Sequence, residues 1–107
     1  MVISTNQVPR YIKQMANISN VSIISRNENM LFSKLDDELV MMSIQNNEYY
    51  GLDNIGTRIW EIIEKPISFS DLMKIILDEY EVNENECKED ILEFLNLLME
   101  KNAIAIK

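Results

Sequence analysis

Histidine is absent from this sequence of 107 residues, and Cys87 is its single cysteine. Histidine is the commonest general base at neutral pH and the commonest metal ligand, so its absence removes the usual means of proton transfer and of zinc binding. A lone cysteine cannot form an intrachain disulfide, which favours a reducing, cytoplasmic compartment. Cys87 has no histidine to activate it, and a small buried hydrophobic residue is the simpler interpretation. We therefore predict a protein that is not an enzyme, has no catalytic residues and needs no metal or cofactor.

Glycine and proline are scarce as well, with two of each, and no phosphate-binding loop of the form G-x-x-x-x-G-K-[ST] or G-x-G-x-x-G is present. The pattern D-x-[DN]-x-[DN]-G of a calcium loop is also missing. Apolar residues make up 47% of the chain, which suits one compact domain of this length. No apolar run approaches the roughly 20 residues that span a bilayer, and residues 1–20 lack the apolar block of a signal peptide. A membrane is therefore not an expected partner.

Basic residues are few and unevenly placed, and the net charge is −8. Residues 1–35 hold four basic residues against one acidic residue, whereas residues 36–107 hold seventeen acidic residues against six basic ones. An acidic body repels phosphate backbones, so nucleic acid is not an expected partner. Most of these acids have the ordinary role of keeping a small domain soluble, which leaves the mildly basic N-terminal segment unexplained.

Three strands joined by tight turns are predicted in the first half of the chain, at residues 30–35, 38–44 and 48–52. Asp36 and Asp37 form the first turn, and Asn46 and Asn47 can adopt the positive φ values of the second. Apolar residues occupy both faces of the second strand, which suggests that the sheet is covered on both sides at least in part. Such a three-stranded antiparallel sheet needs a partner layer to be stable.

Three helices are predicted to supply that layer, and their starts are marked by the capping residues Asp53, Ser68 or Ser70, and Asn83. Pro66 ends the first helix, and Asn102 can end the third in a left-handed conformation. Residues 103–106 alternate small and large like a short closing strand or wing. A sheet followed by three helices indicates an α+β fold of the winged helix-turn-helix type. Residues 1–20 are predicted to be an arm that orders only against something else, with a short helix opening at Pro9 as the alternative. The domain division is residues 1–27 as the N-terminal arm and residues 28–107 as the folded domain.

The predicted third strand carries two tyrosines, and it would be a binding site if it lay at the edge of the sheet. An edge strand presents unpaired N–H and C=O groups that act as a template for an incoming extended peptide. In the plainer interpretation the tyrosines pack on opposite faces of an ordinary strand. The third helix has a broad apolar arc, and a groove between this arc and the third strand would hold the side chains of a bound peptide. In the plainer interpretation the apolar residues of the helix simply form the core. The candidate peptide-binding residues are Glu48, Tyr49, Tyr50, Gly51, Asp90, Ile91, Phe94, Leu95 and Leu98.

Three further residues carry separate expectations. Trp60 lies at helical spacing beside Ile59 and Ile63, and we expect it in the core. Gly56 is expected to let the first helix approach the sheet closely. If the third helix lines a peptide groove, replacing Phe94 with aspartate should abolish peptide binding while the helical fold survives.

The alternative function is that of a winged-helix regulator that binds DNA. In such a protein the third helix enters the major groove. Here the exposed face of that helix would present Glu84, Glu89, Asp90 and Glu93 to the phosphates. That charge has the wrong sign for DNA, so the alternative is disfavoured.

The stretch EYYGLDNIGTRIWEII at residues 48–63 resembles the sequence pattern of PqqD-like proteins, the leader-binding domains known as RiPP recognition elements. The family pattern joins an acidic turn to Y-Y-x-L-N and then to G-x-x-I-W-x-L-L. The matching residues are Asp36, Glu38, Tyr49, Tyr50, Leu52, Gly56, Ile59, Trp60 and Ile63. The resemblance extends less specifically through the later helices, over about residues 28–106. Asp53 stands where the family has Asn, and it keeps the same capping chemistry.

The resemblance implies a non-catalytic protein that binds the leader of a ribosomally synthesised precursor peptide as an added antiparallel strand. It also implies a second partner, a maturation protease or other peptide-modifying enzyme to which the leader is delivered. A free-standing chain of this size looks most like the leader-binding partner of lasso-peptide systems, where a leader peptidase removes the leader and a cyclase closes the ring. Residues 1–27 lie outside the match, and they could contact the enzyme or fold back over the peptide groove.

Overall fold

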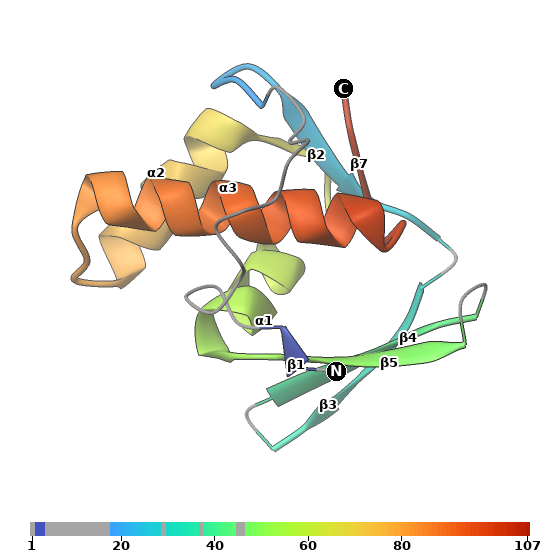
Figure 1. Cartoon of the computed structure of the whole chain (residues 1–107). Helices are drawn as coiled ribbons and strands as arrows, with labels where there is room; N and C mark the ends of the chain where they lie inside the picture. The colour runs from blue at the N-terminus through green and yellow to red at the C-terminus, as the bar shows by residue number, and fades with distance from the viewer. Residues whose placement is uncertain (1, 4–17, 29, 37, 45–46) are drawn as a thin grey trace.

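Two β-sheets and three helices make up the computed structural model of this chain, which describes residues 2–3, 18–28, 30–36, 38–44 and 47–107. The first sheet lies on one side of the helices and the second sheet on the other (Figure 1). This arrangement confirms the predicted α+β class.

The first sheet contains the predicted antiparallel strands, β3 (Met30–Leu35), β4 (Glu38–Ser43) and β5 (Glu48–Leu52). β4 lies between β3 and β5 and pairs with both. Asp36 and Asn47 have φ values of 56° and 53°, so both tight turns fall where the sequence predicted them. Asp37 and Asn46, the other two predicted turn residues, lie outside the described residues.

A fourth strand, β1 (Val2–Ile3), joins this sheet on the outer side of β5 and runs parallel to it. Val2 lies opposite Gly51, and Ile3 lies opposite Leu52. The order of the sheet is β1-β5-β4-β3, so β5 is not its last strand. The condition set for a binding site, a third strand at the edge of the sheet, is therefore not met at the end of β5 that faces β1. The reason is that two residues near the N-terminus supply this neighbour themselves.

The three predicted helices are present as α1 (Asn54–Ile62), α2 (Phe69–Glu79) and α3 (Glu84–Glu100). Each follows a capping side chain that accepts a hydrogen bond from the backbone N–H three residues later, and these caps are Asp53, Ser68 and Asn83. Asn102 follows α3 with a φ of 59°, which is the left-handed conformation that the sequence predicted.

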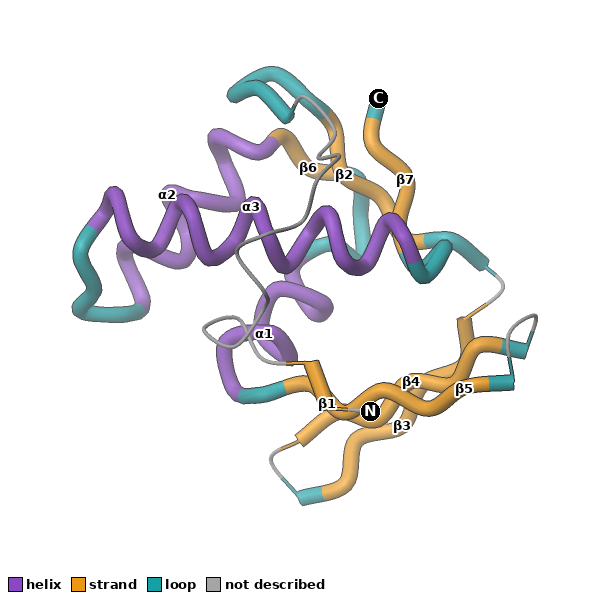
Figure 2. Tube along the Cα trace, viewed as in Figure 1, coloured by secondary structure: helices purple, strands orange, loops and turns teal. Residues whose placement is uncertain are grey.

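The second sheet is antiparallel and consists of β2 (Ile23–Arg26), β6 (Ile67–Ser68) and β7 (Ile104–Ile106), in the order β6-β2-β7 (Figure 2). β7 is the short closing strand that the sequence predicted at residues 103–106. β2 lies before residue 28, where the folded domain was expected to begin. Ile24 of β2 is nevertheless fully buried, so the folded part of the chain includes residues of the expected arm.

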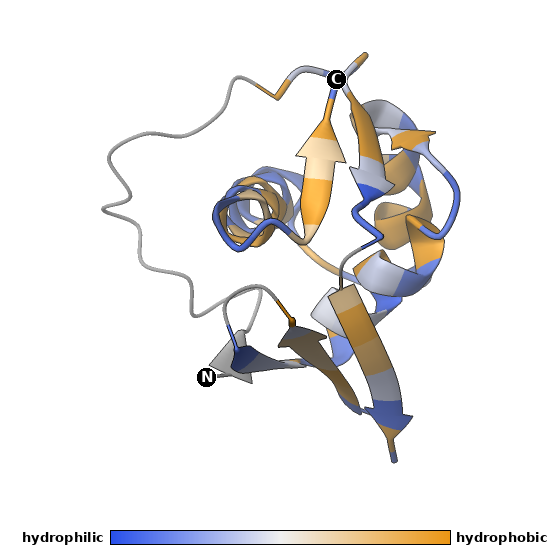
Figure 3. Cartoon of the chain, turned by 90° about the vertical axis from the view of Figure 1, so that its right-hand side faces the viewer, coloured by the Kyte–Doolittle hydropathy of each residue, from blue (hydrophilic) through white to orange (hydrophobic). Residues whose placement is uncertain are grey.

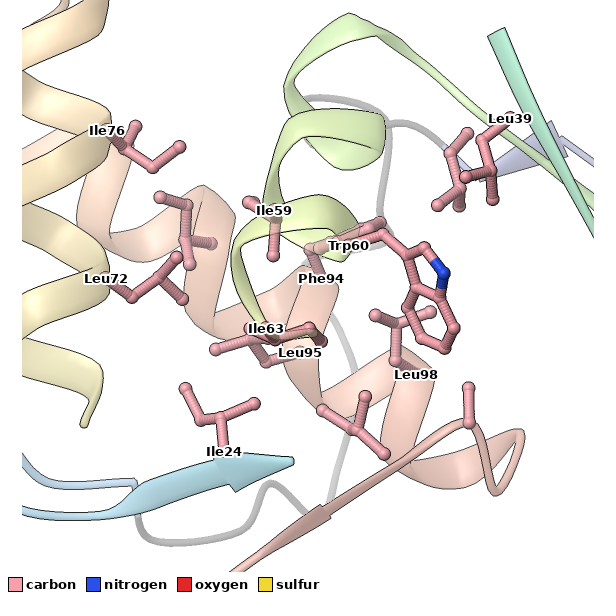
Figure 4. Close-up of a cluster of buried hydrophobic side chains, with 14 of the residues drawn as sticks. Ile24, Leu39, Ile59, Trp60, Ile63, Leu72, Ile76, Phe94, Leu95 and Leu98 are labelled. Carbon is pink, nitrogen blue, oxygen red and sulfur yellow. The ribbon is translucent and has the colours of Figure 1, made fainter. Parts of the chain in front are cut away.

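One hydrophobic core connects the helices with both sheets (Figure 4). Its largest fully buried side chains are Trp60, Tyr50, Phe69, Phe94, Ile24, Met41, Leu52, Ile59, Ile63, Leu72 and Ile76. Trp60 extends from α1 into the space between Leu39 and Leu98, which confirms its expected place in the core.

Gly56 and Thr57 at the start of α1 determine how this helix meets its neighbours. A Cβ added at Gly56 would lie 3.1 Å from Cζ of Phe94, so the missing side chain permits close contact with α3. The sequence-based expectation was close contact with the sheet. Thr57 makes that contact instead, because its Oγ1 accepts a hydrogen bond from the Leu39 N–H at 3.3 Å and donates one to the Leu52 carbonyl at 3.4 Å.

The two faces of the first sheet differ in their surroundings. The inner face packs on the core through residues such as Leu39, Met41 and Tyr50. The outer face carries exposed or half-buried apolar side chains, and no described element covers it. Figure 3 colours the chain by hydropathy, and β3 is orange over its first residues and blue near its end. Val40 and Met42 of β4 are half-buried on the outer face, so the second predicted strand is covered there only in part.

Candidate functional site

The outer edge of β5 is the site at which the candidate strand residues lie. Leu35 is directly opposite Glu38 across a two-residue turn, which makes them the closing hydrogen-bonded pair of that hairpin. Hydrogen-bonded and non-hydrogen-bonded pairs alternate along an antiparallel pair of strands. The closing pair therefore fixes which residues of β4 direct their backbone groups to β3 and which direct them to β5, and the β4–β5 register then fixes the same for β5. By that alternation the backbone N–H and C=O groups of Tyr49 and Gly51 point to the outer edge. This edge is therefore built to pair with one more strand.

Lys101 brings the end of α3 against the start of β5. Its Nζ lies 5.6 Å from the centre of the Tyr50 ring and 4.0 Å from Oε2 of Glu48. Lys101 and Glu48 are both partly exposed, and an ion pair between such groups contributes at most about 1 kcal/mol. Together the two contacts position two of the predicted site residues. The sequence reasoning missed Lys101, although a basic residue directly after a long acidic helix was the available signal.

The apolar residues predicted to line a groove are instead part of the core. Ile91, Phe94, Leu95 and Leu98 are each at most 1% exposed, and Tyr50 is completely buried. These four side chains of the third helix therefore form part of the core, as the plainer interpretation of the sequence predicted. It follows that an aspartate at position 94 would be placed in the core, where an unpaired charge destabilises the whole fold. That variant cannot separate peptide binding from folding, contrary to the sequence-based expectation.

A cavity of about 260 Å³ lies where the chain leaves β5 and passes the first half of α3. Two predicted site residues, Asp90 and Ile91, line it. The sequence reasoning did not include the other lining residues, Asp53, Ile55, Val82, Asn83, Glu86 and Cys87. Burial raises the pKa of the Cys87 thiol above its ordinary value, and the carboxylate of Asp90 adds to the effect. The cavity thus combines an apolar floor with carboxylates, and its thiol stays protonated at neutral pH.

Arg26 forms a second feature that the sequence did not predict, at the junction of the two sheets. Its guanidinium carbon lies 4.9 Å from the centre of the Phe32 ring and 4.6 Å from the Trp60 ring. Arg26 Nε donates a hydrogen bond of 3.0 Å to the Trp60 carbonyl, and Nη2 donates to the same oxygen. Burial lowers the pKa of Arg26 below its ordinary value, and Glu64 and Glu61 oppose that effect. This arrangement holds β2 against β3 and α1.

The apolar outer face of the first sheet forms a shallow depression of about 210 Å³. Its lining residues are Leu31, Phe32, Ser33, Leu35, Val40, Met42 and Tyr49. Tyr49 is 62% exposed and belongs to β5, so this face adjoins the candidate edge. Exposed apolar surface of this kind marks an interaction site more often than it marks an ordinary surface.

Other site types find no support within the described ranges. No group of three or more His, Cys, Asp or Glu residues is arranged there to hold a metal ion. None of the helices described is long and apolar enough to cross a membrane. Of the four acids expected on the exposed face of α3, the helix that would meet DNA in a winged-helix regulator, Glu84 and Glu89 are exposed and Asp90 is half-buried. Glu93 is buried, so that part of the expectation is wrong. The charge of the exposed acids disfavours that role.

Comparison with solved structures finds two similar chains. The first is described as "TbiB1 in Complex with the TbiA(beta) Leader Peptide"; it is 29% identical, with a TM-score of 0.69, and the match covers 75% of this chain and 93% of that one. The second is described as "Lasso peptide synthetase B1 complexed with the leader peptide"; it is 20% identical, with a TM-score of 0.68, and the match covers 77% and 96% of the two chains. Because its sequence identity is only 20%, the second match shows that the two chains share a fold and nothing beyond that.

Sequence comparisons place the chain in a family. No curated protein matches it. The family model for the coenzyme PQQ synthesis protein D (PqqD) matches residues 38–104, from the start of β4 to the start of β7. This range includes β5, all three helices and the cavity beside α3, and it accounts for more than half of the chain. The chain belongs to the PqqD family.

Proposed function

We propose that this chain binds the leader of a ribosomally synthesised precursor peptide as an added β-strand along the outer edge of β5. The observation that carries the proposal is the outward direction of the Tyr49 and Gly51 backbone groups, in a chain 29% identical to one solved with a leader peptide. A pairing of this kind uses backbone groups of the peptide, so it tolerates different leader sequences. Selectivity then depends on a few side chains that enter cavities.

The candidate residues have different roles in this proposal. Glu48, Tyr49 and Gly51 provide the backbone edge, and Asp90 and Ile91 line the cavity that receives a leader side chain beyond the end of β5. Tyr50, Phe94, Leu95 and Leu98 act from the core, where they fix the distance between β5 and α3. The carboxylates at the cavity favour a leader with a basic residue near its anchoring apolar side chain.

We further propose that the protein is an adaptor without chemistry of its own, which delivers the leader to a maturation enzyme such as a leader peptidase. An adaptor needs a second surface for that enzyme. The apolar outer face of the first sheet is suited to this role, because it is exposed and adjoins β5 through Tyr49. An enzyme docked there would be held next to the bound leader. We also propose that the protein serves a lasso-peptide system, because one of the two similar structures is described as a lasso peptide synthetase B1 complexed with the leader peptide.

Isothermal titration calorimetry with the TbiA(beta) leader peptide tests the binding function. The expected result is saturable binding with one peptide per chain and a negative heat-capacity change, since strand addition buries apolar surface. A peptide of the same composition in scrambled order is the control, and we expect it to bind more weakly. Absence of binding by this leader and by leaders of other lasso precursors would overturn the proposal.

A further inference from the structure

β1 occupies part of the edge at which the leader is proposed to bind. Val2 and Ile3 lie opposite Gly51 and Leu52, and they run parallel to β5. Gly51 lies opposite Val40 on the other side of β5, but by the alternation described above its own N–H and C=O point outward, to the side of β1. An open edge would leave the outward groups of Gly51 to water or to another chain. Here the protein's own N-terminal residues take that position.

Pairing of Gly51 with β1 and pairing with a leader strand exclude each other. Each backbone N–H and C=O of a strand faces one neighbour on one side, and neighbouring strands are about 4.8 Å apart. A peptide that follows β5 to its end would have to occupy the space of Val2 and Ile3. The leader must therefore displace β1 or stop before Gly51.

β1 has the properties expected of a strand that can be displaced. It is two residues long, whereas strands in stable sheets are usually about five or six residues long. It contributes few hydrogen bonds, and a longer peptide strand offers more of them. Its attachment to the same chain makes the pairing intramolecular, so β1 competes at a constant effective concentration.

We propose that β1 is a built-in competitor for the leader, which covers the Gly51–Leu52 end of the binding edge and is exchanged for the leader strand. This inference rests on the proposed function. The apparent dissociation constant of a leader equals its intrinsic value divided by the fraction of molecules in which β1 is unpaired. The pairing therefore sets a threshold that favours leaders long enough to pair beyond Gly51. It also protects the end of an exposed edge from pairing with other chains.

Ile3→Pro tests the competition, because proline removes a backbone donor and disfavours strand pairing. Ile3→Val is the matched control, since valine keeps the donor and the preference for extended structure. Two quantities are measured in both variants and in the unaltered protein. One is the exchange rate of the Gly51 amide hydrogen by NMR without peptide, and the other is the affinity for fluorescein-labelled TbiA(beta) leader by anisotropy.

In Ile3→Pro we expect faster exchange of the Gly51 amide and about threefold to tenfold tighter leader binding, which corresponds to β1 being paired in most molecules. Ile3→Val should match the unaltered protein in both measurements. Equal Gly51 exchange in all three proteins would overturn the inference, because β1 would not then cover the edge. Faster exchange with equal or weaker leader binding would also overturn it, since β1 would not compete. If neither this leader nor leaders of other lasso precursors bound any of the three proteins, the proposed function itself would fail, whatever the exchange rates.

Discussion

Proline at position 49 tests the proposed strand addition at one backbone atom. The alternation along β4 and β5 directs the Tyr49 N–H away from β4, so Tyr49→Pro leaves the pairing of those two strands intact. The same substitution removes a donor that a bound leader strand would use. The fold and the binding function are thus affected differently by one change.

The expected loss follows from the energy of an unmade hydrogen bond. A leader carbonyl that is buried without its donor costs about 1–3 kcal/mol. Leader binding should therefore weaken about 5- to 150-fold, since about 1.4 kcal/mol corresponds to a factor of ten. Calorimetric titration with the TbiA(beta) leader measures the affinity, and circular dichroism with thermal unfolding measures the fold.

Two control variants separate the backbone effect from other consequences of the substitution. Tyr49→Thr removes the exposed ring but keeps the N–H, so it should retain most of the affinity. Lys34→Pro makes the same backbone change on β3, at the opposite edge of the sheet, where the N–H also points outward by the same alternation. Lys34→Pro should bind the leader normally. Unchanged affinity in Tyr49→Pro, or equal losses in the two proline variants, would refute the assignment of the leader to β5.

Three other predictions concern the outer face and the stability of the helices. Leu31→Glu places a charge on the apolar outer face, so a co-expressed maturation protease should no longer copurify while the affinity for the leader stays unchanged. Gly56→Ala should lower the free energy of unfolding in urea by up to about 2 kcal/mol, because overpacking against Phe94 costs about 1–3 kcal/mol and a helix-propensity gain of about 1 kcal/mol offsets only part of it. Arg58 of α1 donates hydrogen bonds of 2.8 and 2.7 Å to Glu79 of α2, which lowers the pKa of Glu79 below its ordinary value. This stabilisation is present above the unfolded-state pKa of Glu79 and is lost as the pH falls through the lowered value, so Glu79→Gln should reduce stability at neutral pH and not in strong acid.

Local sequence signals predicted the elements of this fold better than they predicted its contacts. The three strands and their turns follow from alternating apolar residues and from residues such as Asp36 and Asn47 that tolerate positive φ. The helix starts follow from capping chemistry that acts within three residues. β1 carries no such signal, because two residues show no period, and its pairing with Gly51 depends on a contact between distant parts of the chain.

The side chains of the site show the same division between local and distant contacts. The sequence indicated that Gly56 needs a close neighbour, but the identity of that neighbour, Phe94, depends on how α1 and α3 pack. The breadth of the apolar arc on the third helix suggested an accessible groove. Leu92 and Met99, two further apolar residues of that helix, are instead partly buried against the core. Periodicity shows which residues share a helix face and leaves undecided how many elements cover that face.

Backbone NMR of the isotope-labelled protein during titration with unlabelled TbiA(beta) leader tests the central claim most directly. The account predicts that the largest amide shifts occur at Tyr49, Gly51 and the cavity residues Asp90 and Ile91, with cross-strand contacts between leader protons and Gly51. Shifts confined to β3 or to the outer face of the sheet, with the β5 amides unmoved at saturation, would contradict it.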